Sequence, residues 1–188
     1  MPSPPAPLTW LIARLSKLIA TATDSLEAQY PDGVDAWQQE LGRQLARYHG
    51  AAMLAGADAA SLTPAMETAV TTDLATQLRF LGEFGIELQD GSQWQNGWNA
   101  RANMYAGAIK TPYWRGAVDM LPLPAMPADG SSRCLTNCTC MWDIQRLAGS
   151  GNYDCTWTLG ATDHCQVCKQ RAADWAPLRV RNGVLQGG

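Results

Sequence analysis

All six cysteines of this 188-residue chain lie between Cys134 and Cys168. Five of them form two tight groups: Cys134, Cys138 and Cys140, then Cys165 and Cys168, with His164 directly before the second group. Two such groups separated by a loop are the usual sequence form of a tetrahedral zinc site. The distribution predicts a cysteine-free N-terminal part followed by a small module stapled by metal.

Zinc takes four ligands, and the Cys165-Gln-Val-Cys168 spacing turns two sulfurs toward one point. The other two ligands are expected to come from among Cys134, Cys138 and Cys140. Cys138 and Cys140 would share one face of a strand, whereas Cys134 and Cys138 would close a small loop. The sequence does not decide which of these two pairs binds the metal.

Two residues of this region are expected outside the ligand set. His164 is a further candidate ligand, but beside Cys165 in an extended chain it cannot point the same way. We expect it to be a hydrogen-bonding neighbour of the site. Cys155 stands alone within a strand-like run, which is typical of a small buried side chain.

A metal saturated by thiolates is a poor Lewis acid, so we expect one structural zinc per chain. The sequence contains no Gly-rich phosphate loop, no Gly-x-Ser-x-Gly and no His-Glu-x-x-His. His49 is predicted to be a partly exposed structural histidine. We therefore predict no catalytic residues and no enzymatic activity, with an enzyme using an open zinc site as an alternative.

Composition describes a globular protein, with 46% hydrophobic and 16% charged residues. The net charge of −3 and the pI near 5.3 exclude a global basic field, so contact with DNA is not favoured. No apolar run reaches about 18 residues, so no membrane span is expected. The N-terminus lacks the pattern of a secretory signal, and reduced thiols favour metal. In a secreted protein, three disulfides would be the alternative.

Hydrophobic periodicity predicts a helical domain over 8–120 after a Pro-rich arm at 1–7. The expected apolar stripes are Leu8, Leu11, Leu15, Leu18 and Ala22; then Trp37, Leu41, Leu45, Tyr48 and Ala52, ended by Gly56; then Val70, Leu74, Leu78 and Leu81, opened by Thr63-Pro64 and ended near Gly85. A fourth helix is expected after Ser92, with Trp94, Trp98 and Tyr105 in the core.

Three prolines at 121–132 predict an extended linker. Beyond it, the alternation over Cys138–Ile144 and over Tyr153–Leu159 predicts a β-hairpin. A short helix over Lys169–Trp175 and a last strand over Val180–Leu185 are expected to follow. The predicted fold is α+β: a mainly α-helical N-terminal bundle followed by a zinc-stapled β-hairpin module at 133–188.

Three stretches of the sequence together resemble a known pattern. They are the run from Pro127 through Cys134, Cys138 and Cys140 to Trp142, the run from Trp157 through Cys168, and Trp175–Gly183. These stretches resemble the C-terminal segment of tailed-phage head morphogenesis or minor head proteins. Arg101–Gly107 is similar to a segment that precedes the cysteines in that family, and the likeness is strongest over 100–185.

The resemblance implies a structural or assembly protein of the virion, made in the host cytoplasm and placed in the head or neck near the portal. Its partners would be portal, capsid or neck subunits, in an oligomeric arrangement. The alternative is a nucleic-acid-binding zinc-ribbon protein, for which Arg133, Lys169, Arg171, Arg179 and Arg181 would supply the charge.

Overall fold

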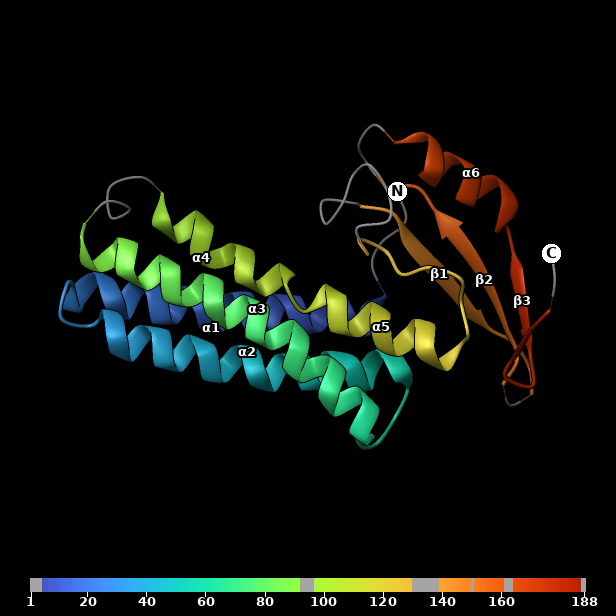
Figure 1. The fold of residues 1–188 in the computed structure, drawn as a ribbon, viewed down its shortest axis with the longest axis horizontal. Coiled ribbons are helices and arrows are strands. Elements are labelled where there is room, and N and C mark those ends of the chain that lie inside the picture. The colour runs from blue at the N-terminus through green and yellow to red at the C-terminus, as the bar shows by residue number, and fades with distance from the viewer. Residues whose placement is uncertain (1–4, 92–96, 130–138, 150, 161–163, 187–188) are drawn as a thin grey trace. The chain divides into compact units, whose positions relative to one another are not determined.

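The computed structural model describes residues 5–91, 97–129, 139–149, 151–160 and 164–186 (Figure 1). Over these residues the protein is α+β and mainly helical, with a small antiparallel sheet, as the sequence predicted. The chain divides into two compact units. We call Ala6–Tyr113 the helical unit, and Met1–Pro5 together with Trp114–Gly188 the sheet unit.

The helical unit is built from α1 (Ala6–Gln29), α2 (Val34–Ala57), α3 (Pro64–Gln89) and α4 (Trp98–Gly107). The predicted stripe of α2 is buried throughout. The aromatic core joins α2, α3 and α4, because Trp37 packs edge-on against both Phe84 and Trp98. Trp98 and Tyr105 are buried as expected, whereas Ser92 and Trp94 lie outside the described residues.

The start of α3 agrees with the helix start that the sequence predicted at Thr63-Pro64. The hydroxyl oxygen of Thr63 accepts a hydrogen bond from the backbone N–H of Met66 at 3.3 Å, and Pro64 opens the helix. The predicted end near Gly85 is wrong, because the helix continues to Gln89. Gly85 instead makes room for Gln38 of α2, whose amide donates to the Leu81 carbonyl at 2.9 Å.

Three other details of the helical prediction are wrong. In α1 the buried stripe passes through Ile19, while Leu18 is 36% exposed. In α3 Leu78 is exposed. The helix α2 ends one residue beyond Gly56, and Asp58 takes the left-handed conformation there. The first of these differences arises because a 3.6-residue repeat does not distinguish the adjacent apolar residues Leu18 and Ile19.

The boundary between the two units falls within α5 (Lys110–Met120). Pro112 lies in the first turn of this helix, where a missing backbone N–H costs nothing. At the other end of the chain, the predicted Pro-rich arm is shorter than expected, because α1 already includes Ala6 and Pro7. Within the described residues, no helix has both the length and the apolar character needed to cross a membrane.

The sheet unit contains β1 (Met141–Arg146), β2 (Tyr153–Thr158), α6 (Gln166–Asp174), β3 (Leu178–Arg181) and β4 (Val184–Gln186). The strands pair antiparallel in sequence order. The predicted β1–β2 hairpin is confirmed, with Trp142 opposite Trp157 and Ile144 opposite Cys155. The helix α6 lies against β2 (Figure 1).

The single last strand predicted over Val180–Leu185 is instead a second hairpin. Asn182 and Gly183 both have positive φ, at 53° and 76°, and together they turn β3 into β4. An Asn-Gly pair is the strongest short hairpin signal because a type I′ turn needs positive φ at both positions.

The predicted linker packs within the sheet unit over its described part. Residues 121–129 contain no helix or strand, yet Leu121 and Leu123 are buried. The carbonyl of Ala125 accepts a hydrogen bond from the indole N–H of Trp142 at 2.9 Å. This segment therefore covers part of the β1 core, and residues 130–132 lie outside the described chain.

Candidate metal centre

Three tryptophans, Trp142, Trp157 and Trp175, pack on one another in the sheet unit. Trp142 and Trp157 meet edge-on across β1 and β2, with ring centroids 5.2 Å apart. Trp175, at the end of α6, stacks on Trp142 at 5.5 Å and meets Trp157 edge-on. Its carbonyl accepts from the backbone N–H of Trp157. The guanidinium of Arg171 lies over both Trp157 and Trp175, so this cluster fixes α6 against β2.

Of the first cysteine group, Cys140 is the member that belongs to the described residues. Cys140 lies directly before β1 and is 4% exposed. Cys134 and Cys138 lie outside the described residues. Thr139, the neighbour of Cys140, runs so close to Gly160 that a Cβ on Gly160 would lie 2.5 Å from the Thr139 carbonyl oxygen. The chain just before β1 is therefore held beside the chain just after β2.

The second cysteine group opens α6. Cys165 is the residue that caps the helix, in an extended conformation, and its carbonyl accepts from the N–H of Lys169. Cys168 lies in the first turn and is fully buried.

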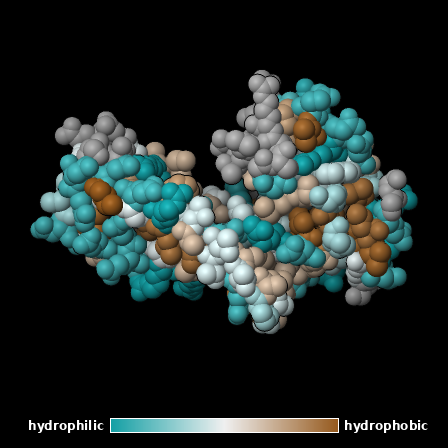
Figure 2. All heavy atoms as spheres, viewed as in Figure 1, coloured by the Kyte–Doolittle hydropathy of each residue, from teal (hydrophilic) through white to brown (hydrophobic). Residues whose placement is uncertain are grey.

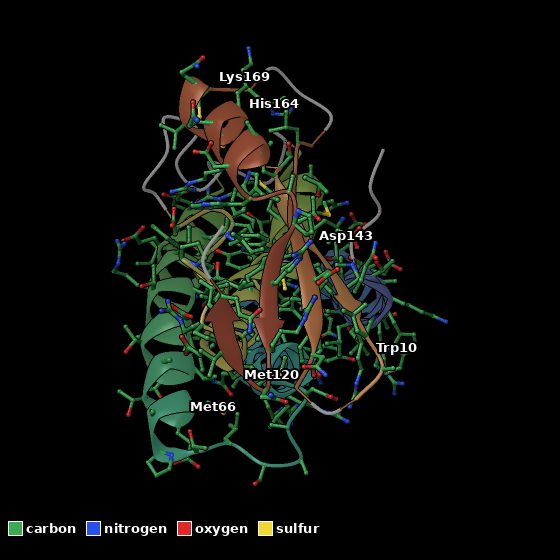
Figure 3. All side chains as sticks on the ribbon, turned by 90° about the vertical axis from the view of Figure 1, so that its right-hand side faces the viewer. Trp10, Met66, Met120, Asp143, His164 and Lys169 are labelled. Carbon is green, nitrogen blue, oxygen red and sulfur yellow. The ribbon has the colours of Figure 1, made fainter. Side chains whose placement is uncertain are left out.

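The structure brings His164, the residue before the second cysteine group, close to Cys140 of the first group. Its Nδ1 lies 3.8 Å from the sulfur of Cys140, although the two residues are 24 positions apart. Figure 3 shows His164 where α6 begins, with Lys169 on the helix beside it. Cys140 is buried and His164 is half-buried. The fold thus brings a thiol from before β1 to an imidazole from before α6.

Cys155 is placed apart from these residues, as the sequence predicted. It is fully buried on β2, between Ile144 of β1 and Leu178 of β3. Burial, with a smaller contribution from the carboxylate of Asp154, raises the pKa of this thiol to about 11. Cys155 is therefore a core side chain and a poor thiolate donor.

Among the described residues, no three His, Cys, Asp or Glu side chains form a group that could hold a metal. The structure therefore brings Cys140 close to His164, and neither Cys165 nor Cys168 joins them in a group of three donors. The donor types fit zinc, because buried thiols and an imidazole are its preferred ligands.

The prediction of a partly exposed His49 is wrong. This side chain is fully buried on α2, and its Nδ1 donates to the Leu45 carbonyl at 2.8 Å. Within the described structure its Nε2 has no hydrogen-bond partner. Burial lowers the pKa of His49. Its position four residues after Leu45 places it on the buried stripe, and that spacing is the signal that sequence reasoning missed.

Comparison of the chain with protein-family models, with curated proteins and with solved structures gave no match.

Proposed function

We propose that this protein is a structural, assembly-related component of a tailed-phage particle, acting in the head or neck near the portal. In this proposal the sheet unit is an interaction module, and one zinc ion bound by both cysteine groups stabilises it. The observation that carries the zinc proposal is the 3.8 Å approach of the Cys140 sulfur to His164. The phage assignment rests on the resemblance over residues 100–185.

The resembling segments are also the ones that build the interior of the sheet unit. They supply Trp142, Trp157 and Trp175, which pack on one another, and the Asn182-Gly183 turn. Core tryptophans and a tight turn maintain a shape and supply no reactive group. This supports a structural role over an enzymatic one.

A structural metal also suits the size of this unit. Its strands have six residues or fewer, and a sheet of this kind buries little apolar surface. Small units commonly compensate with disulfides or a metal. Thiolates from Cys134, Cys138, Cys140, Cys165 and Cys168 compete for the places around the proposed zinc.

The surface of the sheet unit favours a protein partner over nucleic acid. Arg181 is engaged by Asp154 at 2.7 Å, and Arg171 lies on tryptophan rings. Exposed apolar side chains are available on both α6 and β4, at Val167 and Val184. Figure 2 shows hydrophobic surface over the strands on the viewed face. Apolar surface of this kind contributes to protein interfaces.

The zinc proposal is tested by metal analysis of two matched variants, Cys140→Ser and Cys155→Ser. Both replace a buried thiol by a hydroxyl, one beside His164 and one in the strand core. Purified wild-type protein should hold about one zinc per chain, because a structural site is filled in the folded state. Cys140→Ser should lose most of the metal, and Cys155→Ser should keep it. Less than about half a zinc in wild-type protein would overturn the proposal.

The assembly proposal is tested on particles induced from the strain that carries the gene. Quantitative mass spectrometry of purified heads and virions should find this chain in a fixed ratio to the portal protein. An in-frame deletion should block head completion or head–tail joining while capsid protein is still made. Absence of the chain from every particle fraction, together with normal phage yield from the deletion, would refute an assembly role.

A further inference from the structure

We infer that this protein associates with a second copy of itself through the helical unit, and that Ile86 of one copy enters a cavity between α1 and α2 of the other. Both surfaces belong to the helical unit, so the proposed contact needs neither zinc nor the cysteines. Because the two surfaces are unlike, the contact closes either as a reciprocal pair or as a ring of copies.

The cavity has the size of one large side chain. It is lined almost entirely by apolar groups, among them Leu18 and Ala22 of α1 and Leu41 of α2, and its volume is about 210 Å³. Leu18 is 36% exposed, so the cavity opens to solvent. Sites for drug-sized ligands measure about 300–1,000 Å³, whereas a cavity of about 150 Å³ holds benzene. A side chain of a protein partner therefore fits this cavity better than a whole small molecule does.

The surface around the cavity is basic. Four exposed cations flank it along the two helices: Arg14, Lys17, Arg43 and Arg47. The nearby carboxylates are those of Asp24 and of Glu40, and Glu40 is already paired with Arg43. The whole chain has a net charge of −3, so this basic region stands out from the rest of the molecule. Charge complementarity therefore favours an apolar side chain that is flanked by carboxylates.

Ile86 is a side chain of this kind. It lies in the last turn of α3 and is 65% exposed. Glu83 lies one turn before it and Asp90 one turn after it, and both of these acidic residues are exposed. Glu83 is paired with Arg79 at 2.9 Å, but an exposed pair is weak, and a cation of a second copy can replace its partner.

Three other exposed apolar side chains of the helical unit suit the cavity less well. Trp10, Phe80 and Met104 are all exposed. Arginine side chains lie over the rings of Trp10 and Phe80, and Met104 follows Arg101 by one helical turn. The basic surface around the cavity would repel these arginines, whereas it attracts the carboxylates beside Ile86.

Sedimentation velocity of the full-length protein tests the contact. Wild-type protein should form a species heavier than one chain, and salt should weaken it because the flanking charges are exposed. Ile86→Asp should weaken the association at least about tenfold, because the burial of a whole isoleucine side chain is lost. Met104→Asp is the matched control, since it places the same charge at an equally exposed apolar position of α4 and should associate like wild type.

A mixing experiment tests both surfaces together. Ala22→Leu fills the cavity and leaves Ile86 in place, so alone it should associate as poorly as Ile86→Asp. A mixture of the two variants combines one intact Ile86 with one open cavity and should form a one-to-one pair.

Three results would overturn the inference. The first is wild-type protein that sediments as a single chain at about 0.5 mM. The second is an Ile86→Asp variant that associates like wild type. The third is a mixture without the pair, although both variants have the helical circular dichroism of wild type.

Discussion

Gly160→Ala is the sharpest perturbation of the proposed centre that leaves every candidate ligand in place. A methyl group at this position would lie 2.2 Å from the Thr139 hydroxyl oxygen and 2.5 Å from its carbonyl oxygen. The hydroxyl can rotate away, but the carbonyl belongs to the backbone. Real Cβ contacts are essentially never below 3.0 Å, so the two segments must separate by at least about 0.5 Å.

The magnitude follows from two opposing terms. Overpacking of this kind costs about 1–3 kcal/mol. Replacing glycine by alanine returns about 0.4–1 kcal/mol, because the unfolded chain loses conformational freedom. With mid-range values of about 2 and about 0.7 kcal/mol, the net loss should be about 1.3 kcal/mol, and it falls on the contact that holds Cys140 beside His164. Zinc release to a competing chelator should therefore become about tenfold easier.

The assay measures zinc transfer to a coloured chelator and, in parallel, helical circular dichroism. Gly107→Ala is the control, because a Cβ there meets no atom within 4 Å and the residue lies in the helical unit. The control should release zinc like wild type. Unchanged zinc release and unchanged stability in Gly160→Ala would refute the claim that this close approach positions the centre.

Three further predictions concern other parts of the chain. Gly82→Ala should stabilise α3 by about 0.8–1 kcal/mol in urea unfolding, whereas Gly85→Ala should gain less because its methyl displaces Gln38 and breaks a hydrogen bond. Equal gains would contradict this. Burial lowers the pKa of His49, so the unfolded chain binds a proton that the folded chain does not. Stability should fall by up to about 1.4 kcal/mol per pH unit below about pH 6.5, and His49→Gln should lack this component. Cys155 has a pKa of about 11, so at about pH 8 only about one thiol in a thousand is ionised. Mass spectrometry should show its alkylation only after unfolding, and rapid labelling of the native protein would contradict its assignment to the core.

Hydrophobic periodicity was sufficient to predict most of the helices, because it depends only on residues that are near one another in the sequence. The stripe of α2 and the Thr63 cap of α3 could both be predicted from neighbouring residues. The choice between Leu18 and Ile19 could not, since two adjacent apolar residues fit the repeat equally well and only packing against another helix decides between them.

The candidate centre shows the same division between local and long-range information. The cysteine spacing could suggest a metal, and the lone position of Cys155 could suggest a core residue. The approach of His164 to Cys140 depends on the β1–β2 register and on the space that Gly160 leaves, both of which are long-range. The Asn182-Gly183 pair was sufficient to predict the second hairpin. The hydrophobic pattern alone indicated a single strand over Val180–Leu185.

The hydrogen bond from Trp142 to the Ala125 carbonyl determines where the chain can be cut. A fragment that begins at residue 133, just before the cysteines, would leave a buried indole N–H without its acceptor, at a cost of about 1–3 kcal/mol. It would also discard Leu121 and Leu123, whose burial contributes about 1.5–3 kcal/mol each. A fragment that keeps these contacts must therefore begin no later than Leu121, so the cysteine-rich segment packs as one unit with the residues that precede it.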